Sequence, residues 1–417
     1  MVNGMRILQV HNKYRPGWGG EETVVELEAQ LLRENGHEVE TVSLWTGELN
    51  GAKTLKLIAA GFGTVWSFRG HRLVREAIER FRPDLVHTHN TFPLFSPSIY
   101  WAANGADIPV VQTLHNYRLA CANALLLRDD RPCEACVGRL PWAALRYRCH
   151  SSSFFRTLAV ASMIVIHRWI GTYRNKIQAY IALTEFSKAI LIRAGLAADK
   201  IFVKPNFTPD PGPLVALRSR SVVFAGTINR AKGVHLLLEA WSQLALPGYK
   251  LVLLGDGPDR PMLQSRYAHD SSIEWLGPQP RNTVFKYIAT SQWLVLPSLA
   301  YENFAMSVLE AFSLGTPVIV PSHGALATIV SNGRDGWHFT PGLVASLSDT
   351  LRSALSSSPL RWAEWSAAAR ARYLHNMTSS SNYHQLLGIY QGAMKSFPRS
   401  LSPRLEKRCV DGNLGES

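Results

Sequence analysis

The sequence contains no hydrophobic run that is long enough to cross a membrane. Its longest apolar segment, Leu158–Ile166, has about half of the roughly 20 residues that a membrane-spanning helix needs. The first residues lead directly into a strand-like pattern, Arg6–His11, without the apolar segment that is typical of a secretory signal peptide. These two absences lead us to expect a cytoplasmic protein.

The sequence also lacks the signatures of helix-turn-helix, zinc-finger and RNA-binding sheet domains. Its 44 Lys and Arg residues outnumber its 31 Asp and Glu residues, and the net charge of +13 suggests an anionic partner. Nucleic acid, anionic lipid and phosphorylated substrates are the classes that this charge favours, and a basic surface without a specific partner explains it equally well. Because no nucleic-acid motif occurs and the basic residues are spread along the chain, we expect no nucleic-acid partner.

Cysteine is scarce, but four of the five cysteines lie in one window. Cys133 and Cys136 have the C-x-x-C spacing of a zinc half-site, and Cys121 and Cys149 flank them almost symmetrically. Four thiolates could complete a tetrahedral zinc site, whereas disulfides are unusual in a cytosolic chain. The clustering favours a structural zinc site or a redox-sensitive clip over scattered reduced thiols. Cys409, in the polar tail, has no expected role.

Strand patterns alternate with helix patterns along the chain, which predicts parallel sheets that are covered by helices on both faces. The clearest helix covers residues 21–35. The expected strands of the first half are Arg6–His11, Glu38–Leu44, Asp84–His89, Pro109–Leu114 and Ala179–Thr184. Those of the second half are Ser221–Gly226, Tyr249–Gly255, Ser272–Gly277, Gln292–Pro297 and Thr316–Pro321. The predicted fold class is therefore α/β, with two Rossmann-like, doubly wound domains.

A proline-rich linker separates the two expected domains. Residues 205–213 contain four prolines and one glycine, a composition that makes a semi-rigid connection. We expect an N-terminal domain at 1–206, interrupted by a cysteine-rich insert at 121–173, and a C-terminal domain at 207–380. A helix at 381–397 and a polar tail at 398–417 complete the chain.

Residues 300–317 are the most informative stretch. Glu302 and Glu310 are eight residues apart, and the apolar spacing after Asn303 is that of a helix. Glu302 is therefore expected in the loop before this helix and Glu310 inside it. The amides of Asn303, Phe304 and Ala305 would point from the helix N-terminus, where an anion such as phosphate binds. A carboxylate beside such a site fits a ligand that also carries sugar hydroxyls.

Four further segments follow predicted strands: Gly17-Trp18-Gly19-Gly20-Glu21-Glu22, Thr113-Leu114-His115-Asn116, GTINRAKG at Gly226–Gly233, and Leu254-Gly255-Asp256-Gly257-Pro258. Each is weak alone because glycine-rich turns after strands are common. Together with the spacing of Glu302 and Glu310, this array resembles the large group of retaining nucleotide-sugar glycosyltransferases known as family 4.

The resemblance implies a fold, called GT-B, in which the two domains face each other across a cleft. It implies that the acceptor lies mainly on the first domain and the donor nucleotide mainly on the second. It also implies that the C-terminal helix crosses back to the first domain, and that no cofactor is required for catalysis. The donor would be a UDP- or GDP-sugar, and no residue chooses between the two bases.

The resemblance also assigns roles to individual residues. His115 would lie near the transferred sugar, Glu302 would face that sugar, and Glu310 would bind the ribose hydroxyls. Lys232 and Arg230 would neutralise the departing phosphate, where charge develops during transfer. Donor binding is further expected from Gly19, Gly20, Gly226, Asn303, Phe304 and Ala305.

The sequence departs from the family pattern at two points. Thr227 stands where the family usually has arginine, and Arg230 is the expected substitute; the segment after Glu302 lacks the usual glycine. The expected function is transfer of a sugar to a saccharide or lipid-linked acceptor, in surface polysaccharide or glycolipid assembly. The departures leave open the alternative of a catalytically degenerate protein that binds nucleotide sugar or membrane as a scaffold.

The insert suggests that the protein contacts the inner face of an anionic membrane. It combines aromatic and apolar residues with Arg146, Arg148, Arg156 and Arg168, and Arg174 lies just beyond. Leu158–Ile166 is long enough to lie in the headgroup region, although an ordinary buried helix of the first domain explains this segment equally well.

Overall fold

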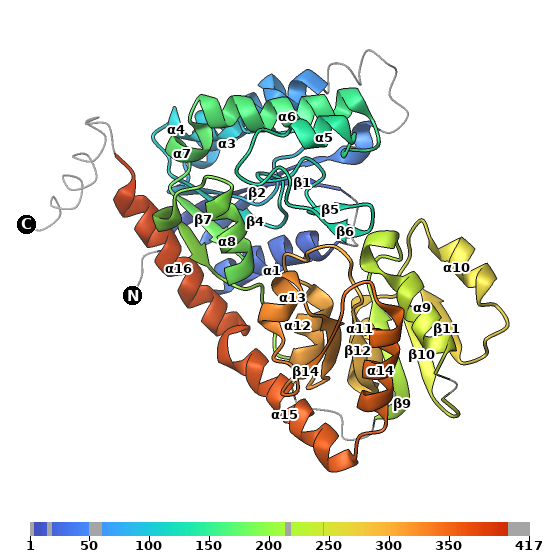
Figure 1. Cartoon of the computed structure of the whole chain (residues 1–417). Coiled ribbons are helices and arrows are strands. Elements are labelled where there is room, and N and C mark those ends of the chain that lie inside the picture. Colours follow the sequence, from blue (N-terminus) through green and yellow to red (C-terminus); the bar gives the residue numbers. More distant parts are fainter. Residues whose placement is uncertain (1–3, 15–18, 50–60, 213–217, 245, 399–417) are drawn as a thin grey trace, which may run out of the picture.

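The computed structural model describes residues 4–14, 19–49, 61–212, 218–244 and 246–398, and it contains two parallel six-stranded sheets. Each sheet carries helices on both faces, and the two halves face each other (Figure 1). The predicted α/β class with two doubly wound domains is confirmed.

The N-terminal sheet has the strand order β2-β1-β3-β4-β7-β8. Its strands are β1 (Arg6–Lys13), β2 (Glu38–Trp45), β3 (Leu85–Thr88), β4 (Val110–Leu114), β7 (Ala179–Ala182) and β8 (Ile201–Val203). The helices are α1 (Gly20–Glu34), α3 (Phe68–Phe81), α4 (Ser98–Asn104), α5 (Trp142–Arg146), α6 (Phe154–Trp169), α7 (Thr172–Asn175) and α8 (Glu185–Arg193). Strands β1, β3, β4 and β7 are almost wholly buried, because helices cover both of their faces.

The C-terminal sheet has the order β11-β10-β9-β12-β13-β14. Its strands are β9 (Ser219–Ala225), β10 (Lys250–Leu254), β11 (Ile273–Gly277), β12 (Ser291–Val295), β13 (Val318–Pro321) and β14 (Gly336–Phe339). The helices are α9 (Val234–Ser242), α10 (Arg260–Arg266), α11 (Arg281–Thr290), α12 (Met306–Ser313), α13 (Gly324–Ile329), α14 (Val344–Leu355) and α15 (Pro359–Asn376). In both sheets the strand order reverses beside the first strand of the unit, and ligands of such folds bind at the carboxyl edge near this point.

The C-terminal helices connect the two domains. Helix α15 packs in the core of the C-terminal sheet, where Trp365 and Tyr373 are buried. The next helix, α16 (Ser379–Ser396), buries Leu386 and Tyr390 in a cluster with strands of the N-terminal sheet. The chain therefore crosses between the domains at the start of α16, and the red helix lies along the N-terminal domain in Figure 1.

All ten strands that the sequence predicts are present, with ends that differ by a few residues. The edge strands β8 and β14 were not predicted, because they have only three and four residues and their burial patterns are mixed. The insert forms a small antiparallel pair, β5 (Leu127–Arg128) and β6 (Arg131–Pro132), followed by α5 and α6. In the part of the chain that the structure describes, no helix combines the length and the hydropathy that crossing a bilayer requires.

Candidate functional site

A cavity of about 160 Å³ lies between the two domains. It is lined by residues that follow strands of both sheets: His115, Asn116, Tyr117, Ala124, Leu125, Asn229, Ala231, Lys232, Ala300, Tyr301, Glu302 and Asn303. Three of the predicted catalytic residues, His115, Lys232 and Glu302, are therefore brought together from positions up to 187 residues apart in the sequence.

The loop after β9 places Lys232 at this cavity. Asn229 begins a short 3₁₀ turn at Arg230–Lys232 by accepting a hydrogen bond from the amide of Lys232. Gly233 then adopts φ +69°, and a Cβ at this position would lie 2.0 Å from the carbonyl oxygen of Pro297. Only glycine allows this close approach, which fixes the turn against the end of β12.

Lys232 and Glu302 form an ion pair at the mouth of the cavity. The ammonium of Lys232 lies 2.7 and 2.9 Å from the two carboxylate oxygens of Glu302. The hydroxyl of Ser298 donates a third hydrogen bond to this carboxylate. Because both side chains keep some exposure, a ligand that enters the cavity can reach the pair.

The residue after Glu302 joins the two domains. The side chain of Asn303 is buried, donates to the carbonyl of Leu114 and accepts from the hydroxyl of Ser187. Tyr117 adds a bond from its hydroxyl to the carbonyl of Glu302, 3.1 Å away. The side-chain amide of Asn303 thus belongs to the domain interface. Its backbone amide is the group that a ligand in the cavity can contact.

Helix α12 begins beside this interface and has the loop–helix arrangement that the sequence predicts. Ala305 is its N-cap and is buried, while Phe304 packs against the C-terminal core. Within the described residues, the amides of Asn303, Phe304 and Ala305 donate to no protein acceptor. Unpaired amides at a helix N-terminus form an anion-binding position.

The N-terminus of α1 approaches the N-terminus of α12 from the opposite domain. A Cβ on Gly20 would lie 3.0 Å from Cγ of Met306, the first residue of α12. Gly19 is the N-cap of α1. The positive ends of two helix dipoles therefore meet near the cavity, which favours a multiply charged anion such as a diphosphate. Gly17 lies outside the described residues.

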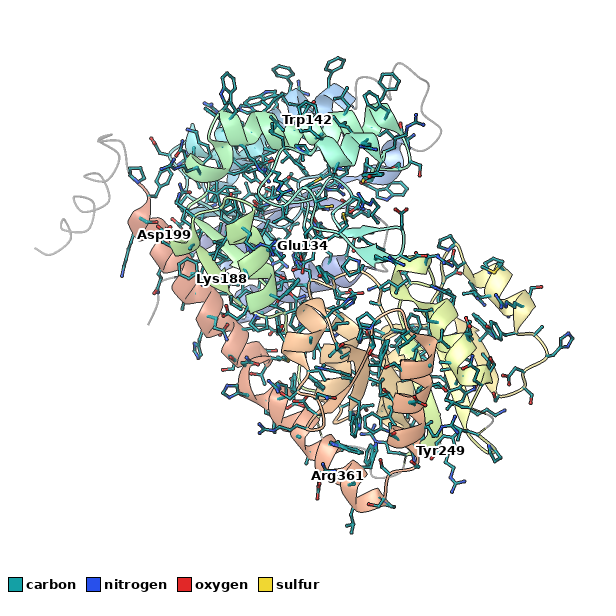
Figure 2. All side chains as sticks on the ribbon, in the orientation of Figure 1. Glu134, Trp142, Lys188, Asp199, Tyr249 and Arg361 are labelled. Atoms are coloured by element: carbon teal, nitrogen blue, oxygen red, sulfur yellow. The ribbon has the colours of Figure 1, made fainter. Side chains whose placement is uncertain are left out.

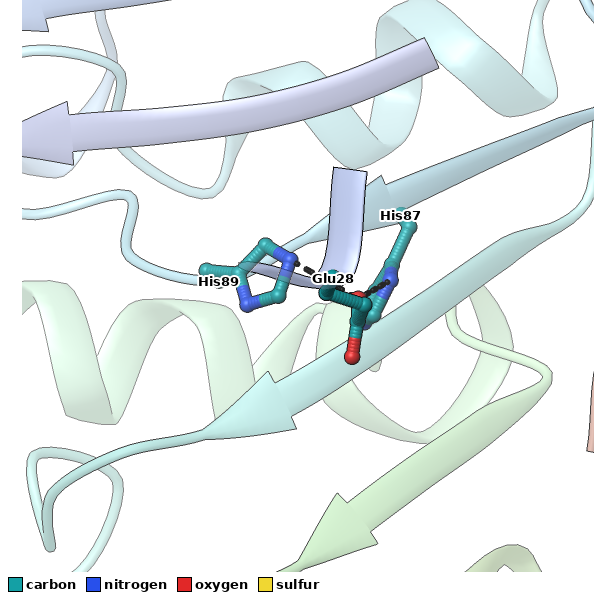
Figure 3. Close-up of side chains that lie close together, drawn as sticks. All are labelled: Glu28, His87 and His89. Carbon is teal, nitrogen blue, oxygen red and sulfur yellow. Dashed lines mark ion pairs between the residues drawn. The ribbon is translucent and has the colours of Figure 1, made fainter. Parts of the chain in front are cut away.

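His115 is held by a chain of buried polar groups. Its Nε2 lies 3.0 Å from Nδ1 of His89, and Nε2 of His89 lies 3.4 Å from the Glu28 carboxylate (Figure 3). Burial and the neighbouring His89 and His11 hold the pKa of His115 well below its usual range, so His115 is neutral. If Glu28 accepts the proton on Nε2 of His89, then Nδ1 of His89 must accept from His115. His115 then carries its proton on Nε2 and leaves Nδ1 as an acceptor.

Burial opposes the charge on Glu28, but His87 and Lys204 hold its pKa well below the usual range. The Lys204 ammonium lies 3.3 Å from one carboxylate oxygen, and His87 Nδ1 lies 2.9 Å from the other. Glu28, His87 and His89 are the one group of metal-type side chains in the described residues whose ligand atoms lie within 4.8 Å of one another. A cation does not fit there, because Lys204 already supplies the positive charge and the Tyr390 hydroxyl lies 2.7 Å from His87 Nδ1.

Glu310 lies inside α12, away from the cavity lining. Its side chain is 12% exposed, and its carboxylate lies 3.6 Å from Nε of Arg281 on α11. Burial raises the pKa of Glu310 from 4.5 to about 7, although Arg281 opposes the shift. A buried carboxyl with only one distant cation is a position that ligand hydroxyls could complete.

Two other predicted donor residues lie at the loop after β9. Arg230 is exposed, and its guanidinium is paired with Asp130 of the insert, 2.7 Å away, so it is not among the residues that line the cavity. Gly226 follows the last residue of β9, and its amide donates to the carbonyl of Leu254. Their roles in donor binding stay predictions.

The four cysteines of the insert are free thiols that lie near one another. Burial raises the pKa of Cys121, Cys136 and Cys149, and repulsion by the neighbouring thiolates adds to the rise at Cys136 and Cys149. In the described structure, however, no three of these sulfurs come within 4.8 Å of one another. Cys121 also donates to Oδ1 of Asn123, as a protonated thiol does. The thiols therefore gather as predicted, without reaching the spacing of zinc ligands.

Several site residues were not predicted. Glu28 and Lys204 pair with each other, but they are 176 residues apart in the sequence. Only the fold brings them together, so no local pattern marks either residue. Tyr117 lies two residues after His115, close enough to the strand end that a search of that loop for polar side chains would have found it.

Comparison with known proteins adds two family matches. Residues 18–209 match the family model described as Glycosyltransferase Family 4. Residues 213–372 match the model described as Glycosyl transferases group 1. The two models meet at the linker, and together they cover every strand of the two sheets except β1, which lies before residue 18.

Individual relatives agree with these matches. A glycogen synthase of Mycobacterium tuberculosis is 25% identical over 353 residues, which are 81% of this chain and 77% of that protein. An exopolysaccharide phosphotransferase of Streptomyces coelicolor is 31% identical over 194 residues, but the aligned part is 44% of this chain and only 20% of that protein. The crystal structure of HepE from Anabaena with UDP-glucose superimposes with a TM-score of 0.65 at 18% identity and covers 93% of this chain and 100% of that one. At that identity the likeness shows the fold alone.

Proposed function

The chain belongs to the GT-B glycosyltransferases of the group 1 and family 4 type, and we propose that it transfers a sugar from a nucleotide-diphosphate sugar with retention of configuration. The acceptor we propose is a saccharide or a lipid-linked saccharide, in surface polysaccharide or glycolipid assembly. The protein would work in the cytoplasm, on the inner face of the membrane.

One observation carries this proposal: Lys232, Glu302 and His115 line the same interdomain cavity, beside the unpaired amides that begin α12. When the anomeric C–O bond breaks, negative charge develops on the departing diphosphate. Lys232 and the helix amides are fixed positive groups at the place where that charge would form. His115 lines the same cavity, and its neutral ring can form a hydrogen bond with a sugar hydroxyl there.

The pairing of Lys232 with Glu302 supports a role for both in the donor site. A donor diphosphate competes with Glu302 for the ammonium, which frees the carboxylate to accept hydrogen bonds from the sugar. A uridine or guanosine donor is compatible with this scheme, because it involves only the diphosphate and the sugar. HepE, the relative with the same fold, was crystallised with UDP-glucose, which favours testing uridine donors first.

Structural zinc on the four cysteines stays part of the proposal. Ion binding would require the thiols to deprotonate and to move together, and it would relieve the thiolate repulsion that contributes to the raised pKa values of Cys136 and Cys149. Catalysis in this scheme uses only the side chains and amides named above.

The experiment is a transfer assay with UDP- and GDP-sugars and simple glycoside acceptors, followed by proton NMR of the product. Retention predicts a product with the same anomeric configuration as the donor. A product of inverted configuration would leave the transferase assignment in place and contradict the proposed stereochemistry. No transfer and no donor hydrolysis above background would instead favour the catalytically degenerate alternative.

A further inference from the structure

We propose that the face formed by residues 61–68, α5 and α6 is a docking surface for an anionic lipid bilayer. This face lies on the side of the N-terminal domain that is farthest from the C-terminal domain (Figure 1). Figure 2 labels Trp142 over these helices, at the top of the view. The proposal goes beyond sugar transfer, because it concerns where the protein resides.

Large apolar side chains gather on this face with unusual exposure. Trp169 is 86% exposed, Phe68 81%, Phe155 79% and Phe62 77%. Trp142, Phe154, Leu158 and Ile166 are exposed on the same elements. Exposed apolar patches of this kind mark interaction sites on soluble proteins, and Trp and Phe are the residues that anchor at the interface of a bilayer.

Helix α6 has the two faces that an interfacial helix requires. Val160, Met163 and Ile164 are buried against the domain, while Phe155, Leu158 and Ile166 point to solvent. One side of Leu158–Ile166 is therefore a buried helix of the domain, as one of the two expectations had it, and the other side is an exposed apolar surface, on which the membrane expectation depends. The residues 61–68 lie beside it, since His167 hydrogen-bonds to the carbonyl of Val65 at 2.7 Å.

The charge of this region selects an anionic partner. Residues 135–184 contain seven Arg and Lys residues and not one Asp or Glu. Arg146, Arg148 and Arg156 are exposed and form no ion pair in the described structure. Arg168 differs from the sequence expectation, because its guanidinium donates to the carbonyls of Leu119 and Arg139 and is used within the fold.

An anionic bilayer fits these features better than a second copy of the chain does. Pairing two copies through this face would bring two sets of unpaired arginines together, and like charges repel across an interface. A bilayer with anionic headgroups offers apolar depth for the aromatic side chains and negative charge for the arginines at the same time.

The buried side of α6 reaches the layer of the N-terminal domain that carries His115. Met163 of α6 and His115 both line a second cavity, of about 30 Å³. A protein docked through α6 places its N-terminal domain against the bilayer and leaves the C-terminal domain on the aqueous side (Figure 1).

The test is co-sedimentation of the full chain with vesicles of phosphatidylcholine, alone or with 40% phosphatidylglycerol, in low and high salt. We expect binding to the anionic vesicles that falls at least about tenfold in high salt, because exposed charges are screened. The triple variant Phe68→Ser/Phe155→Ser/Trp169→Ser and the triple variant Arg146→Gln/Arg148→Gln/Arg156→Gln should each weaken binding at least about tenfold.

The matched control is Met262→Ser/Leu360→Ser, which removes exposed apolar side chains of the C-terminal domain (57% and 81% exposed) and should leave binding unchanged. Circular dichroism and donor hydrolysis verify that each variant is folded. The proposal is overturned if wild-type protein stays in the supernatant with anionic vesicles at low salt. It is also overturned if the control variant loses as much vesicle binding as the two triple variants do. Concentration-dependent dimers that the aromatic triple variant abolishes, without vesicle binding, would make the face a self-association surface and also overturn it.

Discussion

The ammonium of Lys232 lies 2.7 Å from a carboxylate oxygen of Glu302, although the two residues are 70 positions apart in the sequence. Both side chains line the interdomain cavity, so the cation expected to bind phosphate and the carboxylate expected to face the sugar neutralise each other in the ligand-free protein. A donor would have to separate this pair. The contact therefore links the charge of the cavity to the presence of a ligand, and it predicts how variants at the site should behave.

Removing the ammonium should damage transfer far more than removing the nearby guanidinium. Lys232→Ala should lower kcat/KM by at least about a hundredfold, the scale observed when one charge-stabilising group is taken from an active site. Arg230→Ala should have a smaller effect, because Arg230 is paired with Asp130 outside the cavity lining. Steady-state kinetics on both variants shows which of them loses more kcat/KM. A near-native rate for Lys232→Ala would mean that the phosphate is held elsewhere.

Glu310→Gln should separate stability from donor binding. Burial raises the pKa of Glu310 from 4.5 to about 7, so its contribution to stability is complete below about pH 4.5 and is lost as the pH rises through about 7. Glutamine mimics the protonated acid. The variant should therefore gain stability relative to wild type between about pH 5 and pH 8, by up to about 3 kcal/mol.

The same variant should bind donor more weakly, because the ribose loses charge-assisted hydrogen bonds. Urea unfolding and nucleotide-sugar titration measure the two effects, with Glu364→Gln, an exposed glutamate of α15, as the control. A large loss of Tm with unchanged donor affinity would assign Glu310 a structural role instead.

The buried pair of Glu28 and Lys204 should be strongly coupled. Removing one partner of a buried ion pair leaves an uncompensated charge and costs about 3–5 kcal/mol, so Glu28→Gln and Lys204→Met should each destabilise the fold on that scale. The double variant should be less destabilised than the sum of the two, since neither charge then remains unpaired. Equilibrium unfolding in urea measures the cycle. Additive losses would show that the two groups act independently.

Zinc should bind to the insert if its thiols can move together. Titration of the purified, reduced protein in competition with a chromogenic chelator should then give one tightly bound ion per chain. Bound zinc should protect Cys121, Cys133, Cys136 and Cys149 from alkylation, and Cys133→Ser should abolish binding. Cys409→Ser is the control and should bind normally. Four freely reactive thiols and no retained metal would exclude the site.

The sequence revealed the architecture because its signals are local. Buried parallel strands appear in the sequence as apolar runs. The loop and helix around Glu302 and Glu310 are predicted by the spacing of the apolar residues alone. The edge strand β8 was missed because it has only three residues, and β14 because its four residues mix buried and half-buried positions, whereas the four-residue strands β3 and β7 are wholly buried.

The contacts that complete the site are not local, and the sequence did not show them. Glu28 sits on a helix among other glutamates, and only its distant partner Lys204 distinguishes it from a solvated residue. The backbone amide of Asn303 was expected to serve the donor, but nothing in the sequence showed that its side chain bonds to Leu114 and Ser187 of the other domain. Such roles depend on how the two domains meet, which no single segment encodes.

The most direct test of the account is a thermal-shift comparison of wild-type protein and Lys232→Ala against a panel of UDP-, GDP- and ADP-sugars. A ligand that binds only the folded state at about 100 times its Kd stabilises it by about 2.7 kcal/mol, enough to raise Tm by several degrees. The account predicts that at least one nucleotide sugar does so for wild type and shifts the variant much less. If no nucleotide sugar raises Tm, or if one raises it equally in both proteins, the interdomain cavity is not the donor site.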